Sequence, residues 1–212
     1  LRSDFVSNVS HELRTPLHAI RMYAETLSLG RYRDETQQQR YLDTITQESN
    51  RLSRMVNNVL DFSRLEGGRL TYRLVSMDLG SVVNQTLDEL EPGLLESGFR
   101  VTRTVNADLH IVGDPDHVDG VVGNLIANAA KYSREMREID VSVVQVGDQC
   151  CVEVSDRGVG VPEDDRVRVF ERFQRASNVG DVTGAGLGLA LVKDVMVAHS
   201  GSVDVETREG GG

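Results

Sequence analysis

The first candidate for chemistry is a histidine on a predicted amphipathic helix. Seven apolar residues recur every three or four positions, the period of one helix face: Phe5, Val9, Leu13, Leu17, Ile20, Ala24 and Leu27. At about 100° per residue from Val9, His11 falls near 200°, on the opposite side of the helix. Thr15 and His18 fall beside it, and Glu12 is its neighbour in sequence. The pattern therefore predicts an exposed His11 in a polar setting.

An exposed imidazole beside a carboxylate has the properties of a nucleophile. A neutral imidazole has a free lone pair at pH 7. The carboxylate of Glu12 can keep one ring nitrogen protonated and leave the other free to attack. Pro16 removes a helical hydrogen bond and is expected to bend the helix beside His11. By pattern alone a surface histidine is more often simply solvated, and that is how we interpret His18.

Two amides and one ammonium share a face of a second predicted helix, residues 118–132. Asn124, Asn128 and Lys131 stand at i, i+4 and i+7, within about 60° of one another. Amide oxygens are hard ligands suited to Mg²⁺, and lysine offers a point charge to phosphate. With 21 arginines and two lysines in the chain, Lys131 is an unusual choice for generic surface. Taken alone, however, this face could be an ordinary polar surface.

A first glycine-rich segment follows the predicted strand 150–155. Asp156 ends this strand and is followed by Gly158 and Gly160, which allow a sharp turn and a close approach of the backbone to a ligand. A carboxylate at Asp156 accepts hydrogen bonds, which is what the exocyclic amine of adenine requires. The pattern is suited to binding a nucleotide base.

A second glycine-rich segment, residues 184–188, opens the predicted helix 186–199. The free N–H groups and the positive dipole end of such a helix favour phosphate. The polar residues 177–183 precede it and are interpreted as a lid over the nucleotide. No strand leads directly into Gly184, so a dinucleotide-binding fingerprint does not fit, and neither a lysine-containing phosphate loop nor a Ser/Thr/Tyr kinase signature is present.

Together these segments resemble the sensor histidine kinases of two-component systems. Residues 5–17 are similar to the phosphoacceptor box of that family, and residues 124–133 to the asparagine box of its ATPase domain. Residues 156–160 resemble the first glycine box, 170–173 the phenylalanine box and 184–188 the second glycine box. Type II topoisomerases, heat-shock chaperones and mismatch-repair ATPases share the fold of that domain. The resemblance extends over nearly the whole chain, but the lid is short and His117 stands where an arginine is common.

The resemblance implies a role for each matching residue. His11 would be phosphorylated, Glu12 would act as base, and Thr15 would position water when the partner is dephosphorylated. ATP and Mg²⁺ are the implied cofactors, with Asn124 and Asn128 as metal ligands. The implied nucleotide-binding set is Asn124, Asn128, Lys131, Tyr132, Asp156, Gly158, Gly160, Phe173, Gly184, Gly186, Leu187 and Gly188.

These residues need two kinds of domain to position them. Residues 1–66 read as a helical hairpin with broad apolar stripes, which we expect to dimerise into a four-helix bundle. Residues 67–212 mix strands and helices, as in an α/β sandwich ATP-binding domain. We expect a hinge at Gly67-Gly68 and a final strand beyond the last residue. The first part has no net charge and the second has a net charge of −10, which argues against nucleic acid as a partner.

The smaller elements follow from local pattern. Strands are predicted at residues 99–105, 109–112, 139–146, 150–155 and 202–206, with a hairpin turn at Gly147-Asp148. The adjacent Cys150 and Cys151 are interpreted as reduced cysteines with no disulfide or zinc site. No apolar run approaches the roughly 20 residues of a membrane span. We therefore expect the cytoplasmic portion of a sensor whose membrane anchor, if any, lies in other segments.

The expected function is autophosphorylation of a histidine by ATP, followed by transfer to an aspartate of a response-regulator receiver domain. Regulator phosphatase activity and a homodimer are expected as well. Two alternatives share parts of the pattern. An ATPase of the chaperone or topoisomerase class would lack the phosphoacceptor helix, and a non-enzymatic dimerisation module would have a vestigial nucleotide site.

Overall fold

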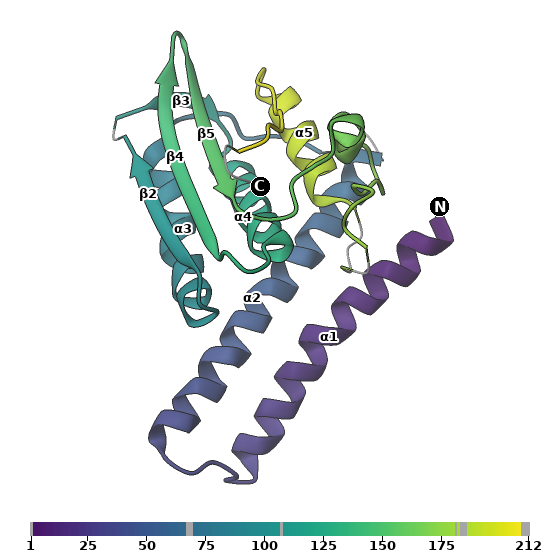
Figure 1. Cartoon of the computed structure of the whole chain (residues 1–212), viewed down its shortest axis with the longest axis vertical. Helices are drawn as coiled ribbons and strands as arrows, with labels where there is room; N and C mark the ends of the chain where they lie inside the picture. Colours follow the sequence, from purple (N-terminus) through teal and green to yellow (C-terminus); the bar gives the residue numbers. More distant parts are fainter. Residues whose placement is uncertain (1, 67–69, 107, 181, 183–185, 209–212) are drawn as a thin grey trace. The chain divides into compact units, whose positions relative to one another are not determined.

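The protein is described by a computed structural model that covers residues 2–66, 70–106, 108–180, 182 and 186–208. The described residues form two compact units, one made of the helices α1 and α2 and the other of all remaining elements (Figure 1). No helix in the described ranges is both long enough and apolar enough to cross a membrane.

The helical unit is an antiparallel pair. Helix α1 spans Arg2–Ser28 and helix α2 spans Glu35–Glu66. Gly30, at a φ of 63°, turns the chain between them. The side chain of Asp34 accepts the N–H of Gln37 at 2.8 Å and so caps the start of α2. Packing of α1 on α2 leaves large apolar side chains exposed in the single chain: Leu17, Met22, Leu29, Leu42, Val56 and Leu60.

The second unit is built on two small sheets. The larger has the order β2-β4-β5, with β2 at Arg100–Val105, β4 at Glu138–Val146 and β5 at Gln149–Asp156. Strand β4 is parallel to β2 and antiparallel to β5. The smaller sheet pairs β1, Val75–Asp78, with β3, His110–Gly113, in antiparallel fashion.

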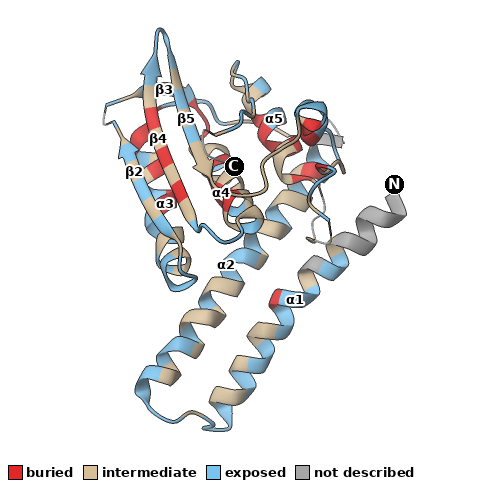
Figure 2. Ribbon diagram, viewed as in Figure 1, coloured by how far each residue is buried: buried red, intermediate tan, exposed pale blue. Residues whose placement is uncertain are grey.

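The α-helices in the described part of this unit are α3 at Leu79–Glu96, α4 at Pro115–Tyr132 and α5 at Gly188–Ala198. The apolar faces of α3 and α4 and the inward face of β4 form the main core, and the buried residues are coloured red on the ribbon in Figure 2. Its fully buried members include Val83, Leu87, Val122, Ile126, Ile139, Val141 and Val143. The 3₁₀ turns Glu163–Asp165 and Arg168–Phe170 follow β5.

Aspartates set the starts of two helices. Asp78 caps α3 by accepting the N–H of Gly80 at 3.1 Å and the hydroxyl of Ser81 at 2.6 Å. Asp114 caps α4 by accepting the N–H of Asp116 at 3.1 Å, with Pro115 in the first turn. These caps determine where α3 and α4 begin.

The expected fold class is confirmed, with differences in detail. No element is predicted from the sequence at residues 70–98, whereas the structure places β1 and α3 there, because the glycines and Pro92 of α3 obscure its period. The strand expected at 202–206 is wrong for the described residues, since no ladder partner pairs with this segment. Its Val203 and Val205 still pack against buried side chains.

Candidate nucleotide site and phosphoacceptor helix

The polar face of α4 is a consequence of what the helix buries. Val121, Val122, Ile126 and Ala129 face the interior. At about 100° per residue, Asn124, Asn128 and Lys131 fall together on a different side of the helix. Asn124 and Asn128 are half-buried on that side, and Lys131 is exposed one turn further on. The ammonium of Lys131 lies 5.5 Å from the ring centroid of Tyr132.

The start of α5 lies against the two amides of α4. A methyl group added at Gly188 would be 3.6 Å from Oδ1 of Asn124 and 3.8 Å from Nδ2 of Asn128. Leu187 precedes the helix, is buried, and makes no side-chain capping bond. The first N–H groups of α5 therefore have no capping side chain, and they lie beside the two amides. This arrangement favours binding of an anion.

The first glycine box closes against the end of α4. The N–H of Gly158 donates to Oδ1 of Asp156 at 2.6 Å, and the N–H of Val159 donates to the carbonyl of Tyr132 at 3.2 Å. A side chain at Gly158 would put its Cβ 2.6 Å from that same carbonyl oxygen. Glycine is therefore required at 158 for this close approach, and Gly160, at a φ of 63°, is required by its backbone conformation.

Asp156 is a half-buried carboxyl at the end of β5. Burial raises the pKa of Asp156, although the N–H of Gly158 and the positive charge of Arg208 act in the opposite direction. One oxygen already accepts from Gly158, and a carboxylate has further lone pairs for a ligand amine. Because burial disfavours the charged form of this carboxylate, a hydrogen-bond donor on a ligand would stabilise it.

The phenylalanine box contacts the second glycine box. The N–H of Phe173 donates to the carbonyl of Gly186 at 2.9 Å. Phe173 has a φ of 66° and Gly186 has the same value, which is unfavourable for Phe173 and ordinary for glycine. A Cβ at Gly186 would lie 2.8 Å from the carbonyl carbon of Phe173, so the two segments meet backbone to backbone.

Two residues that sequence reasoning missed hold the start of the lid. The buried carboxylate of Asp165 accepts both the N–H and the hydroxyl of Ser177, each at 2.6 Å. The amide of Asn178 donates to the carbonyls of Val159 and Gly160, each at 3.0 Å. The contact of Asp165 with Ser177 spans 12 residues and the contacts of Asn178 span 18 and 19, so no local signal could have identified them.

The structure thus brings Asn124 and Asn128 to Gly188, Asp156 to Gly158, and Phe173 to Gly186. Gly184 lies outside the described residues. Among the described residues no group of three or more His, Cys, Asp or Glu side chains could hold a metal ion. Any Mg²⁺ here would need oxygen ligands from the nucleotide in addition to the amides of α4.

In the helical unit, His11 and Thr15 are exposed on α1, as expected from the helix period. The hydroxyl of Thr15 lies 3.4 Å from the carbonyl of His11, one turn earlier. Pro16 lies inside α1 and cannot donate to the carbonyl of Glu12, whose side chain is outside the described set. His18 is also exposed, in agreement with its interpretation as solvated surface.

Comparison with protein families gives two matches along the chain. Residues 1–68 match the His Kinase A (phospho-acceptor) domain. Residues 113–212 match the Histidine kinase-, DNA gyrase B-, and HSP90-like ATPase domain. The chain belongs to the sensor histidine kinase family. The resemblance inferred from the five sequence boxes is thereby confirmed, and an ATPase domain of this type implies ATP binding.

Curated relatives align along the full chain. This chain is 34% identical over 213 residues to the sensor-like histidine kinase SenX3 of Mycolicibacterium smegmatis, and the alignment covers 100% of this chain and 55% of that protein. Identity is 34% over 224 residues to Drug sensory protein A of Synechocystis and 31% over 215 residues to the sensor protein kinase WalK of Staphylococcus aureus. The chain covers 34% and 52% of those two proteins, so it spans about a third to a half of its curated relatives.

Solved structures have the same fold. Full-length ShkA in complex with AMPPNP matches 97% of this chain and 43% of its own, at 26% identity and a TM-score of 0.63. The mycobacterial sensor histidine kinase MprB matches 64% of this chain and 86% of its own, at 29% identity and a TM-score of 0.56.

Proposed function

We propose that this chain uses ATP to phosphorylate His11 and then passes the phosphoryl group to an aspartate of a response-regulator receiver domain. The observation that supports this most is the presence of both halves of the reaction in one chain. An exposed histidine stands on α1, and the asparagine and glycine boxes meet around α4 and the start of α5. Neither half alone would specify a histidine kinase.

For nucleotide binding, we assign adenine to Asp156 and the phosphates to α4 and α5. Asp156 accepts the exocyclic amine, in a turn kept narrow by Gly158. The amides of Asn124 and Asn128 and the ammonium of Lys131 face the phosphates together with the N–H groups near Gly188. The remaining members of the proposed nucleotide-binding set are Tyr132, Gly160, Phe173, Gly184, Gly186 and Leu187.

The residues present fit a magnesium ion only as part of a nucleotide complex. Two neutral amide oxygens supply hard ligands without a cluster of charge, which leaves the remaining positions to phosphate oxygens and water. When bound, Mg²⁺ would neutralise negative charge on the transferring phosphate. Asn124 and Asn128 are the residues that would hold it.

The proposed transfer is an in-line displacement at phosphorus. A ring nitrogen of His11 forms a bond to the γ-phosphorus while the bond to the β–γ bridging oxygen breaks and ADP leaves. The proton on the other ring nitrogen passes to the carboxylate of Glu12. In the second reaction the phosphoryl group leaves the imidazole for an aspartate oxygen of the regulator. Thr15 is proposed to position water when the phospho-regulator is hydrolysed.

We also propose that the helical unit forms a homodimer. Leu17, Leu42, Val56 and Leu60 are between 41% and 57% exposed in the single chain. Large apolar side chains along a helix pair are the surface that a four-helix bundle would bury. Residues 1–66 are then the dimerisation and phosphoacceptor domain and residues 67–212 the ATP-binding domain. Because the reaction consumes ATP and involves a regulator, we place this portion in the cytoplasm.

Labelling with γ-³²P-ATP distinguishes the three candidate functions. A kinase retains the label on the protein, a chaperone-type ATPase releases only phosphate, and a binding module does neither. The label should be lost in acid and retained in alkali, as expected of a phosphoramidate. His11→Gln should abolish it, whereas His18→Gln, the same change on the same helix, should not. Retained label in His11→Gln would refute the assignment of the phosphoacceptor.

A further inference from the structure

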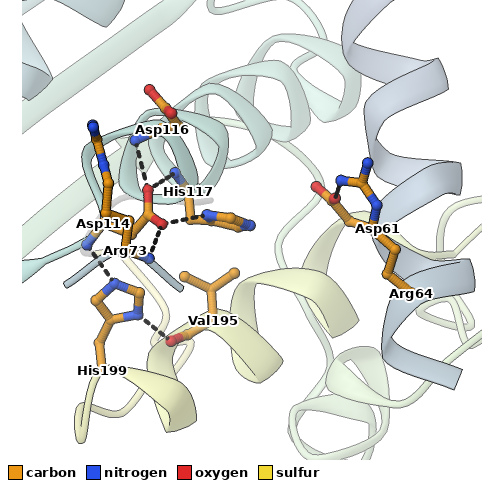
Figure 3. A network of polar contacts seen from close by, with 8 residues as sticks. All are labelled: Asp61, Arg64, Arg73, Asp114, Asp116, His117, Val195 and His199. Carbon is orange, nitrogen blue, oxygen red and sulfur yellow. Dashed lines mark hydrogen bonds and ion pairs between the residues drawn. The ribbon is translucent and has the colours of Figure 1, made fainter. Parts of the chain in front are cut away.

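A network of polar contacts joins the start of α4 to the end of α5, away from the nucleotide boxes (Figure 3). The backbone N–H of Asp114 donates to Nε2 of His199 at 2.9 Å. On the other side of the ring, Nδ1 of His199 lies 2.7 Å from the carbonyl oxygen of Val195. His199 is the residue that follows α5, and Asp114 is the residue that caps α4.

These two contacts determine the protonation of the imidazole. An N–H group can only donate, so Nε2, which faces the N–H of Asp114, carries no proton. A carbonyl oxygen can only accept, so Nδ1, which faces Val195, carries one. His199 is therefore neutral in this arrangement. A second proton, on Nε2, would point one donor at another over 2.9 Å and remove the contact with Asp114.

Among the described residues, the titratable side chains next to His199 belong to Tyr72 and Asp114. The ring centroid of Tyr72 is 5.4 Å from that of His199, and Asp114 meets Nε2 through its backbone N–H. The carboxylate of Asp114 already accepts the N–H groups of Arg73 and Asp116, and its Oδ2 lies 3.1 Å from Nδ1 of His117. An added proton on His199 would therefore reach the carboxylate only if the ring left its present position.

Asp114 stays charged over the physiological range. Burial acts to raise the pKa of Asp114, but the N–H of Arg73 and the contacts with His117 hold it below its ordinary value. Nδ1 of His117 already faces this carboxylate at 3.1 Å, whereas His199 meets Asp114 only through the backbone N–H.

The two helices run antiparallel, and each end of α5 lies against a different part of α4. His199 meets Asp114 at one end, and Gly188 lies against Asn124 and Asn128 at the other. Asp114 and Asn124 are ten residues apart on α4, or about 15 Å along its axis. Val121, Val192 and Val195 form a buried cluster in this unit, and the same helices contribute them. A shift of α5 at the His199 end is thus carried to Gly188 by a packed, stiff pair.

We propose that His199 is a positioning residue for nucleotide binding. As a neutral imidazole it holds α5 on α4 through its hydrogen bond with Asp114, and protonation removes that bond. The inference rests on the nucleotide site proposed above. Its consequence is that nucleotide affinity falls in mild acid, because the N–H groups at the start of α5 move relative to the amides of α4. A displacement of about 1 Å is enough to weaken such a site.

The test is the pH dependence of Mg²⁺·ADP binding, measured by calorimetry on the whole chain at about pH 7.5 and about pH 5.5. ADP is used because it cannot phosphorylate the protein. In His199→Gln the side-chain carbonyl can still accept from Asp114 but does not titrate. We expect wild type to lose at least about threefold more affinity than this variant between the two pH values. The exposed His110 provides the matched control, and His110→Gln should follow wild type.

A second variant separates positioning from folding. His199→Asn is too short to reach Asp114, so it should bind ADP weakly at both pH values, with urea unfolding recorded alongside. Equal pH dependence in wild type and His199→Gln would overturn the proposal, and so would wild-type affinity in His199→Asn. If neither variant folds, His199 is only structural and the proposal is wrong. Failure of wild type to bind ADP at about pH 7.5 would instead refute the nucleotide site itself.

Discussion

Gly188 lies against Asn124, with room for one methyl group between the start of α5 and the amide of α4. A Cβ at Gly188 would be 3.6 Å from Oδ1 of Asn124, an ordinary van der Waals distance. Gly186, two residues earlier, has no such room, because its Cβ would lie 2.8 Å from the backbone of Phe173. Glycine is therefore required at 186 by the backbone of the folded chain, whereas at 188 its lack of a side chain leaves space beside Asn124.

Alanine substitutions at the two positions should distinguish an effect on stability from an effect on ATP binding. Gly188→Ala should change the free energy of unfolding by less than about 1 kcal/mol, since helix geometry there suits alanine. Its methyl group should nevertheless crowd a bound phosphate and weaken ATP binding. Gly186→Ala should destabilise the fold by at least about 1–2 kcal/mol, because φ is positive and the contact is with backbone. Urea unfolding and ATP titration of both variants provide the comparison, and equal stability of the two would contradict the geometry.

Asp156→Asn should weaken nucleotide binding without loss of fold stability. Because the pKa of Asp156 is raised in the folded state, the ionised carboxylate opposes folding. That cost is absent below the unfolded-state pKa and fully present above the folded-state pKa, so it applies at neutral pH. The amide oxygen of asparagine can still accept from Gly158. We expect the free energy of unfolding at neutral pH to stay equal or rise, while ATP affinity falls. If the variant were less stable than wild type and bound ATP normally, Asp156 would be a stabilising residue with no role in ATP binding.

Asn128→Asp should impair nucleotide binding through charge. The side chain is half-buried beside Gly188, where the phosphates are proposed to lie. A carboxylate there repels phosphate and alters the charge around Mg²⁺, so affinity or turnover should fall about tenfold or more. Asn106→Asp, at an exposed position after β2, makes the same chemical change elsewhere in the unit. Calorimetry showing identical ATP·Mg²⁺ binding in the two variants would remove Asn128 from the site.

Thr15→Ala should separate the two activities proposed for α1. The hydroxyl is exposed and its contact with the carbonyl of His11 is long, at 3.4 Å, so stability should change by no more than about 0.5 kcal/mol. Autophosphorylation should survive, because the ring nitrogen of His11 is untouched. Dephosphorylation of the regulator should fall about tenfold or more, since positioning water can contribute that much.

The measurement for Thr15 needs the cognate regulator, phosphorylated separately and mixed with each variant. Decay of the phospho-regulator is then followed in the presence of ADP. Thr44→Ala, on α2, removes a similar hydroxyl that bonds one turn back at 2.8 Å and provides the control. Equal decay with wild type and Thr15→Ala would mean that Thr15 is ordinary helix surface.

Local pattern was sufficient for the elements whose signals lie within a few residues. The period of α1 placed His11 and Thr15 outside, and the Gly147-Asp148 pair predicted the hairpin between β4 and β5. The side-chain types of Asn124, Asn128 and Asp156 indicate nucleotide chemistry once they are combined with the two glycine-rich segments. Side-chain type and period are properties of neighbours in the chain, so sequence can report them.

Contacts between distant segments were decided by tertiary structure alone. His199 bonds to Asp114 across 85 residues, and Asp165 binds Ser177 across 12. The strand expected at 202–206 has the alternating valines of a strand, yet in the described residues it has no ladder partner. Packing places distant segments next to one another, and these neighbours decide backbone pairing, burial and the close approach of a glycine to another segment. The sequence therefore determined which residues could perform the chemistry, and packing decided which of them meet.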